Sequence, residues 1–261
     1  MKVDIPPLPA RPRTLFRIWL LLLLALLILI VRDLDIDFRT LIAGISDIGE
    51  YFSRFGTPEL SEVPRYLGLM GQTLATALWG TIFAFVISFL IAPWAARGLS
   101  PNRVTHRFAR ETLNFMRAMP DLLLALIFVS AMGLGPMPGI LALGVHTAGF
   151  LGKFFAETLE RVDHGKYEAL FATGAGFTQT VMFAGWPSIL RETAGYTLYI
   201  LDRNVRMAAV LGLVGAGGIG LELHDTLRLF LYDKAATLIL LILFTILIVD
   251  YLSSALRKRL K

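Results

Sequence analysis

Charged and polar side chains interrupt the apolar stretch between about Ser188 and Val214. Near the middle of this stretch these residues are Asp202, Arg203, Asn204 and Arg206. Asp202 and Arg206 are four residues apart, which brings them together on one face of a helix and allows an ion pair. Arg203 lies about 100° around that helix from Asp202 and lacks an obvious local partner. The pattern predicts either a paired structural element or a cation that lines a path for an anion.

Other residues in the chain offer Arg203 a partner besides a passing anion. Asp121 and Glu192 each lie in or beside an apolar stretch, and a pair with either would explain Arg203 equally well. His146 lies in a further apolar stretch and is a candidate for the same path. The charge pattern by itself leaves these interpretations open.

A second region, residues 163–180, combines a helical apolar pattern with a glycine break. Tyr167, Leu170 and Phe171 recur at helical spacing, and the pattern is interrupted near Gly174. Asp163 precedes the pattern and is a suitable N-cap. A short helix with an apolar face outside the membrane needs a partner surface, which is either the bilayer surface or a groove on another protein.

The composition indicates a membrane protein rather than a soluble enzyme. Of the 261 residues, 56% are hydrophobic and 17% are charged, and the mean hydropathy is +0.66. Soluble chains average about 45–50% apolar and about 25% charged residues. The chain has no cysteine, and its four histidines are not at metal-ligand spacing. The sequence therefore predicts neither a metal site nor a set of catalytic residues.

Five long apolar stretches and the charged stretch Ser188–Val214 are each long enough to cross a membrane as a helix. The five are Leu15–Val31, Leu67–Ala92, Leu113–Gly133, about Gly139–Leu159, and Ala235–Leu256. The first also fits the apolar region of a signal peptide, but no small-residue cleavage site follows it, so we expect it to remain as a span. The prediction is an all-α, polytopic membrane bundle of about six transmembrane helices.

The distribution of basic residues predicts the orientation of this bundle. Fifteen Lys and Arg residues fall in the segments on one side of the six spans and six on the other. Loops rich in Lys and Arg stay in the cytoplasm. Both termini and residues 163–180 are therefore expected in the cytoplasm. The net charge of +5 is assigned to this orientation effect rather than to nucleic-acid binding.

The segment 163–187 resembles a known signature. Glu168 and Ala169 are followed by Gly174 six residues after the glutamate, and by Pro187 thirteen residues after the glycine. This spacing is similar to the "EAA…G…P" signature of permease subunits of bacterial binding-protein-dependent ABC importers. Leu170 stands where the signature has its second alanine. The resemblance implies a type I ABC importer permease fold and a coupling helix, at about residues 163–180, that docks into a cleft on an ATPase subunit.

Family resemblance also implies roles and partners. Glu168, Ala169 and Gly174 would form the core of the coupling helix, with Tyr167 and Phe171 as its apolar contacts. The chain has no P-loop, so ATP and Mg²⁺ would reside on a separate ATPase dimer and no cofactor is expected in this chain. A second permease subunit, expected to be a second copy of this chain, and a periplasmic solute-binding protein would complete the importer.

The run from residue 204 to residue 223, together with shorter pieces between residues 99 and 153, is similar to phosphonate-import permeases, a branch that includes phosphite and hypophosphite importers. The charges and polar residues within the spans make Arg203, Arg206, Asp202 and His146 the candidates for the translocation path. The candidates for an outer gate or hinge are Gly215, Gly217, Gly218 and Gly220. These glycines also fit a dinucleotide-binding pattern, but no strand–helix–strand unit surrounds them, which excludes that reading.

The resemblance covers about residues 67–256. Residues 1–66 are expected to form a cytoplasmic segment, the first span and a periplasmic loop, and residues 257–261 a basic cytoplasmic tail. We expect a permease subunit of the bacterial inner membrane that moves phosphonate or a related phosphorus oxyanion by alternating access. The glycine-rich run is also similar to methionine-import permeases, so an importer of methionine or another small solute is an alternative. A passive anion channel is an alternative from a different class.

Overall fold

The computed structural model describes residues 13–34 and 38–260, and every regular element in this part of the chain is a helix. The chain divides into two compact units, Met1–Arg54 and Phe55–Lys261, each with its own internal contacts. The first unit contains α1 (Arg13–Asp33) and α2 (Phe38–Ser53). The expected first span coincides with α1, whose apolar window has a mean hydropathy of 2.8 and no buried residues. Such a helix is stable only when lipid or another protein surrounds it.

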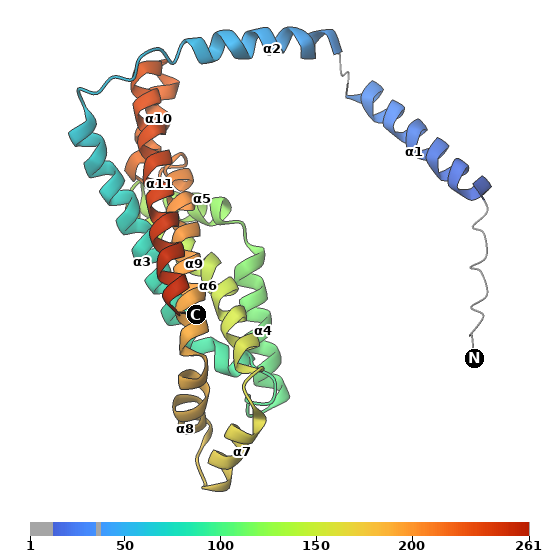
Figure 1. Cartoon of the computed structure of the whole chain (residues 1–261), viewed down its shortest axis with the longest axis vertical. Helices are drawn as coiled ribbons and strands as arrows, with labels where there is room; N and C mark the ends of the chain where they lie inside the picture. The colour runs from blue at the N-terminus through green and yellow to red at the C-terminus, as the bar shows by residue number, and fades with distance from the viewer. Residues whose placement is uncertain (1–12, 35–37, 261) are drawn as a thin grey trace, which may run out of the picture. The chain divides into compact units, whose positions relative to one another are not determined.

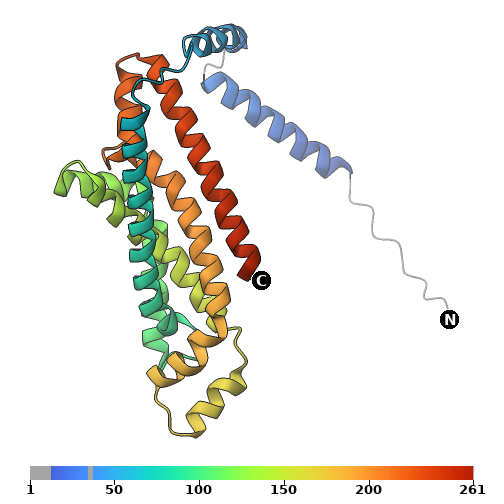
Figure 2. The ribbon, with the colours of Figure 1, turned by 60° about the vertical axis from the view of Figure 1, so that its left-hand side comes forward.

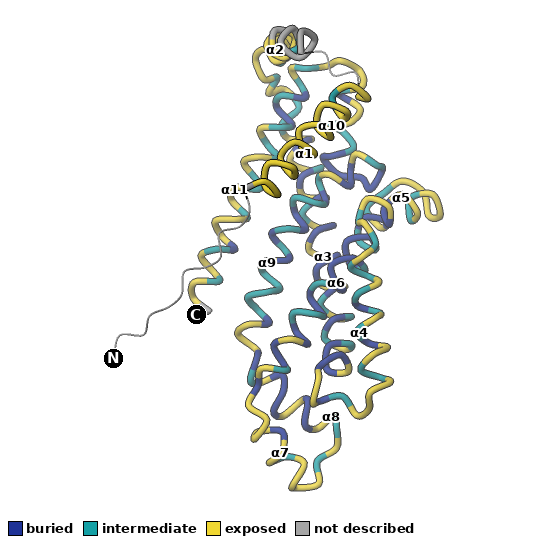
Figure 3. The backbone as a smooth tube through the Cα atoms, turned by 90° about the vertical axis from the view of Figure 1, so that its right-hand side faces the viewer, coloured by how far each residue is buried: buried dark blue, intermediate teal, exposed yellow. Residues whose placement is uncertain are grey.

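In the second unit, long helices pack around α6 (Pro136–Leu159). α3 (Val63–Ala95) and α9 (Trp186–Gly212) pack along α6, and α11 (Tyr232–Leu260) packs against α9 (Figures 1 and 2). In the apolar window of α6, 67% of the residues are buried, against 33% in α3 and 22% in α11. Figure 3 shows the same contrast along the backbone. Protein therefore encloses α6, whereas α11 turns most of its apolar surface outward.

Glycines allow α3 and α6 to approach closely. A Cβ atom on Gly80 would lie 2.9 Å from Cβ of Leu143, and one on Gly144 would lie 2.2 Å from a ring carbon of Phe83. Helix association in lipid depends on van der Waals packing and interhelical hydrogen bonds, so small residues at a contact stabilise it.

Short helices lie at the two opposite ends of this unit (Figure 1). One end carries α7 (His164–Ala172), α8 (Phe177–Thr180) and the π-helical turn η1 (Val181–Gly185), and the other carries α10 (Gly218–Arg228). Phe155 and Trp186 belong to the core cluster that includes Tyr167 of α7, whereas Tyr66 and Ile219 belong to a cluster that joins α3 to α10.

The expected third span, Leu113–Gly133, is not one continuous helix, and that prediction was wrong. The segment is divided between α4 (Arg103–Ala118) and α5 (Asp121–Met132), which are bent by 84° relative to each other. Pro120 has no N–H to continue the helix and disfavours helical backbone at Met119. Met119 is accordingly extended, with φ −73° and ψ 118°.

By length and composition, four helices of the described residues qualify as membrane spans, and the bent α4–α5 pair would make a fifth. The sixth expected span corresponds to α9. Its 27 residues extend about 40 Å, which is enough to cross the hydrocarbon layer. It does not qualify by composition because it carries Arg191, Glu192, Asp202, Arg203 and Arg206. The contacts of these charged groups therefore decide whether the helix is stable in a membrane.

Candidate translocation and coupling sites

Asp202 and Arg206 form the ion pair that their spacing predicts. Two guanidinium nitrogens of Arg206 donate to the two carboxylate oxygens of Asp202, at 3.1 and 2.6 Å. The side chain of Asp202 is 5% exposed and that of Arg206 is 42% exposed. A two-point, charge-assisted contact offsets part of the cost of burying the carboxylate. The pair is a structural element of α9 in which each charge neutralises the other.

Arg203 is held by a histidine and an aspartate from other helices. Its guanidinium donates to Nε2 of His146 on α6 at 3.2 Å, and it lies 3.9 Å from the carboxylate of Asp121 at the start of α5. It also lies over the ring of Phe150, 5.1 Å from the ring centroid. Of the two acids that the sequence offered as partners, the structure brings Asp121 to Arg203.

The break between α4 and α5 fixes the ring of His146. Since Met119 ends α4 and its carbonyl is free to accept, Nδ1 of His146 donates to that carbonyl at 2.7 Å. A neutral imidazole carries one N–H, so Nε2 is left as the acceptor that Arg203 needs. The bent pair thus positions a partly buried cation at the contact of α5, α6 and α9.

This polar cluster retains a donor for a further acceptor. The Nη1 atom of Arg203 is buried and has no hydrogen-bond partner among the described residues. A second guanidinium, that of Arg117, lies 5.5 Å from the centroid of the same Phe150 ring. Two guanidinium groups therefore lie at the ring of Phe150, and the free N–H donor of Arg203 is suited to an anionic acceptor.

Asn204 ties three helices together beside this cluster. Its side-chain amide donates to the hydroxyl of Thr81 on α3 at 2.9 Å and to that of Thr147 on α6 at 3.5 Å. The residue is completely buried. Interhelical hydrogen bonds of this kind fix the packing of membrane helices, so Asn204 positions the helix that carries Arg203.

Residues 163–180 form the helix and break that the pattern predicts. The side chain of Asp163 caps α7 by accepting from the backbone N–H of Gly165 at 3.0 Å. At the other end, Gly174 has φ +85°. The N–H groups of Gly174 and Ala175 donate to the carbonyls of Phe171 and Leu170. This is a Schellman termination, which requires a left-handed residue and therefore favours glycine.

The side chains of α7 divide into an anchored set and an exposed set. Tyr167 is 3% exposed, and its hydroxyl donates to the carbonyl of Leu159 at 3.0 Å. Burial raises the pKa of Tyr167 to about 12 because the phenolate would lose its hydration. Glu168 and Ala169 are exposed, and Phe171 is 45% exposed. A partner protein can therefore reach these three residues but not the buried tyrosine.

The glycines after α9 serve two different purposes. Gly215, Gly217 and Gly218 have φ values of +97°, +77° and +71°, so they form the turn into α10. Gly220 has ordinary helical backbone, but a Cβ there would lie 1.9 Å from the carbonyl oxygen of Ala209. Gly220 therefore allows α10 to pack directly on α9.

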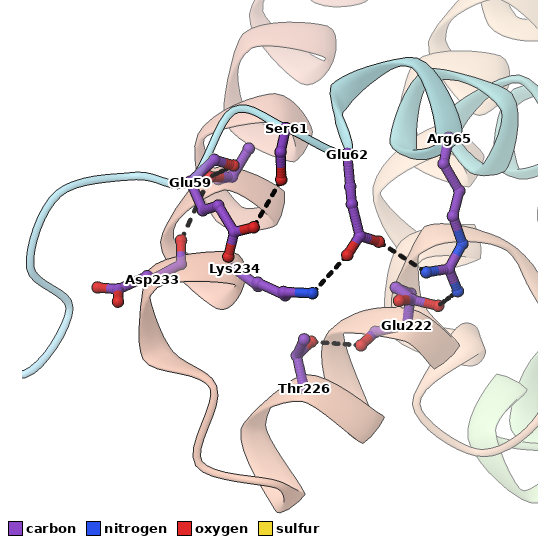
Figure 4. Close-up of polar contacts among 9 residues, drawn as sticks. Glu59, Ser61, Glu62, Arg65, Glu222, Thr226, Asp233 and Lys234 are labelled. Atoms are coloured by element: carbon purple, nitrogen blue, oxygen red, sulfur yellow. Dashed lines mark hydrogen bonds and ion pairs between the residues drawn. The ribbon is translucent and has the colours of Figure 1, made fainter.

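An ion-pair network at the α10 end, shown in Figure 4, was not predicted from the sequence. The carboxylate of Glu62, just before α3, accepts from Lys234 of α11 and, at 2.8 Å, from Arg65. Arg65 also contacts Glu222 of α10 at 2.8 Å. Hydrogen bonds from Lys234 and then Arg65 lower the pKa of Glu62. The network joins α3, α10 and α11 across gaps of 157 and 172 residues, which no local pattern reveals.

Residues 84–261 match the family described as the inner membrane component of binding-protein-dependent transport systems. The chain belongs to this family. The phosphite transport system permease protein PtxC of Stutzerimonas stutzeri is 38% identical over 226 residues, which cover 87% of this permease and 82% of the relative. The phosphate-import permease protein PhnE of Mycolicibacterium smegmatis is 39% identical over 231 residues, 88% of this chain and 43% of that one.

Solved structures share the fold of the permease. A chain of the MetNI methionine ABC transporter in an inward-facing conformation is 20% identical, with a TM-score of 0.67 over 78% of this chain and 99% of that chain. A chain of a bacterial alginate ABC transporter is 14% identical, with a TM-score of 0.61 over 95% and 96% of the two chains. The predicted type I ABC importer permease fold is confirmed. Together with the family match, this makes the chain a transport subunit of the inner membrane rather than an enzyme.

Proposed function

We propose that this permease moves phosphite, a phosphonate or a related phosphorus oxyanion across the inner membrane as part of an ATP-driven importer. The observation that carries the proposal is the extent of its similarity to PtxC and to the putative phosphite transport system permease protein HtxC of Stutzerimonas stutzeri. The identities are 38% and 39%, over 87% and 85% of this chain. The free donor of Arg203 is chemically suited to an oxyanion, because guanidinium N–H groups match phosphate-like oxygens.

The candidate path residues have unequal roles in this proposal. Arg206 is neutralised by Asp202, so this pair stabilises α9. Arg203 retains an unpaired donor and is the cation that an anion would meet, while His146 holds its guanidinium in position. The glycine turn of Gly215, Gly217 and Gly218, with Gly220 packed on α9, would form the hinge of the outer gate.

Coupling to ATP hydrolysis is proposed to occur at α7. Glu168, Ala169 and Phe171 would contact an ATPase subunit, Gly174 would give the helix its end, and Tyr167 would transmit its movement to the core. ATP and Mg²⁺ would be bound by an ATPase dimer. Two copies of this permease would form the path. Alternating access would follow as ATPase closure draws the coupling helices together.

The proposed orientation of the permease in the membrane follows from the assignment of α7 to ATPase coupling. The α7 end of the second unit and both termini would lie in the cytoplasm, as the basic residues predict. The α10 end would face the periplasm, where a solute-binding protein would deliver the anion.

Proteoliposomes with the assembled permease, ATPase and solute-binding protein test the proposal. We expect uptake of labelled phosphite or methylphosphonate that requires ATP on the ATPase side and stops when the ATPase subunit is omitted. Methionine uptake without phosphite or phosphonate uptake would support the methionine importer, which the glycine-rich run and the fold similarity to MetNI favour. Phosphite flux through the permease alone would show a passive channel.

A further inference from the structure

The end of α3 contacts the proposed coupling segment, residues 163–180, at two places. The ring of Trp94, in the last turn of α3, lies 4.5 Å, centroid to centroid, from that of Phe177 at the start of α8. Gly98, just beyond the end of α3, packs so closely on His164 at the start of α7 that an added Cβ would lie 2.9 Å from its ring. The helix end and the turn that follows it therefore touch the segment near both of its ends.

The turn after α3 is fixed by the carboxylate of Glu160. The backbone leaves the helix at Ala96, with φ −81° and ψ 128°, and the N–H of Arg97 donates to Oε1 of Glu160 at 2.7 Å. The same oxygen accepts from Nη2 of Arg110 on α4 at 3.2 Å. Glu160 itself directly follows α6 and precedes by three residues Asp163, the N-cap of α7. One carboxylate oxygen thus joins the ends of α3 and α6 to α4, next to the start of the coupling segment.

The carboxylate of Glu160 is partly shielded from water. Its side chain is 23% exposed, and that of Arg110 is 25% exposed. Hydrogen bonds to an ionised group are about twice as strong as those between neutral groups, and partly buried charges are screened less than exposed ones. Glu157, three residues earlier in α6, is exposed. Glu160 is therefore suited to hold a backbone turn in place, and Glu157 is a matched residue without this burial.

From this joint, α4 continues to the candidate anion site. It packs directly on α6, because a Cβ on Gly149 would lie 2.5 Å from the backbone N of Arg117. At its far end, the carbonyl of Met119 accepts from His146, whose other ring nitrogen accepts from Arg203. Contacts therefore run from the joint along α4 to the guanidinium that we propose meets the anion.

We propose that Glu160 is a positioning residue for coupling, because it holds the turn after α3 against α7. Movement of residues 163–180 then reaches α3 and α4, in addition to α9, which follows the coupling segment through η1. Without the carboxylate oxygen, the covalent connections of the segment to α6 and α9 remain, but the turn that carries Gly98 is released from the end of α6. The inference rests on the coupling role proposed for residues 163–180.

The number of phosphite ions taken up per ATP hydrolysed tests this role. It is measured in proteoliposomes that contain the permease with its ATPase and solute-binding protein. A hydrogen bond to a charged group changes an equilibrium constant about tenfold or more, so Glu160→Ala is expected to lower the uptake per ATP about tenfold while the ATPase still co-purifies. Glu157→Ala is the control and should keep the wild-type value. A merely structural role would lower uptake and hydrolysis together and leave their ratio unchanged.

Two conservative variants separate the reach of the Glu160 side chain from its charge. Glu160→Gln keeps an acceptor oxygen at the same reach and should retain most of the uptake per ATP. Glu160→Asp keeps the charge but is one methylene shorter, so it should fail to reach the N–H of Arg97 and behave like Glu160→Ala. If Glu160→Ala does not assemble with the ATPase, this second pair of variants decides the question.

Hydrogen exchange of the purified permease tests the joint independently of transport. Glu160→Ala and Glu160→Asp are expected to speed exchange of the Arg97 amide about tenfold, because its acceptor is lost. Unchanged exchange at Arg97, or a wild-type ratio of uptake to hydrolysis in Glu160→Asp, would overturn the proposal. So would a ratio in Glu160→Gln as low as that in Glu160→Asp.

The wild-type transporter shows whether the proposed function itself fails. If it carries methionine instead of phosphite, the same ratio measured for methionine still tests Glu160. If it shows no ATP-driven uptake of either solute, the proposed function is wrong, and the coupling role of Glu160 is wrong with it, even where exchange at Arg97 responds as expected.

Discussion

Arg203 and His146 are joined by a hydrogen bond that fits one protonation state of the imidazole. Nδ1 of His146 donates to the carbonyl of Met119, so Nε2 must accept from Arg203. A doubly protonated ring would turn a second N–H toward the guanidinium and place two cations in contact. The neutral ring therefore fixes the position of Arg203 while leaving its Nη1 atom free.

Replacing Arg203 tests whether this free donor serves the anion. Arg203→Gln is expected to lower phosphite uptake at least about tenfold, because a hydrogen bond to a charged group contributes about 1.5–3 kcal/mol. Arg191→Gln, an exposed residue on the same helix with the same change of charge, is the control and should transport normally. Equal uptake by the Arg203 and Arg191 variants would show that Arg203 does not contribute to the translocation path.

The Asp202–Arg206 pair predicts that the stability losses of the two substitutions are not additive in a double-mutant cycle. Arg206→Gln leaves a carboxylate that is 5% exposed without its partner, and Arg206 itself is 42% exposed. We expect a loss of about 1–3 kcal/mol in the free energy of unfolding, less than for a fully buried pair. Adding Asp202→Asn should recover most of it, measured by denaturation of the purified permease. Additive losses would mean that the pair contributes nothing to stability.

Local features of the candidate sites follow from sequence spacing. The Asp202–Arg206 pair, the cap at Asp163 and the helix end at Gly174 each depend on residues within one or two turns of each other. The periodicities that govern such contacts are properties of the helix itself. The resemblance to a permease signature added the fold, which spacing alone does not give.

Contacts between distant segments needed the structure. His146 and Arg203 are 57 residues apart, and their contact depends on the bend at Pro120, which the apolar run from Leu113 to Gly133 conceals. Hydropathy responds to composition, and a helix and a broken helix pair can have the same composition. Tyr167 is another example. The apolar pattern suggested that it contacts a partner, but in the structure it is buried in a core cluster with residues of α3 and α9, which are distant in the sequence.

Gly174 gives a test of the proposal that α7 is the coupling helix. With φ +85°, alanine at this position costs about 1–2 kcal/mol, because the left-handed region brings Cβ against the next carbonyl. Gly174→Ala is therefore expected to loosen the end of α7 and to reduce both ATPase co-purification and ATP-driven uptake. Gly176→Ala, at φ −77°, is the matched control and should retain both. Wild-type coupling in the Gly174 variant would disprove the assignment.

Gly220 tests the contact between α9 and α10. A Cβ there would lie 1.9 Å from the carbonyl oxygen of Ala209, so alanine forces the helices apart. We expect Gly220→Ala to lower the melting temperature of the permease and to impair uptake more than ATPase binding, which we propose for the opposite end of this unit. Gly195→Ala in α9, where no atom lies within 4 Å of the added carbon, should have neither effect. A Gly220 variant as stable as the Gly195 variant would refute this account of the hinge.

Tyr167 predicts how stability depends on alkaline pH. Burial raises its pKa from 10.0 to about 12, so the neutral phenol is favoured in the folded state. A pKa that is higher in the folded than in the unfolded state gives stability that is complete below pH 10 and is lost as the pH rises toward 12.

Tyr167→Phe should lower the free energy of unfolding at pH 8 by about 1 kcal/mol, because the carbonyl of Leu159 loses its donor. The variant should also lose less stability than the wild type between pH 10 and pH 11. Tyr251→Phe, whose side chain is 75% exposed, controls for the general titration of tyrosines. Parallel alkaline curves for the Tyr167 variant and the wild type would show that the phenol is not buried in the folded permease.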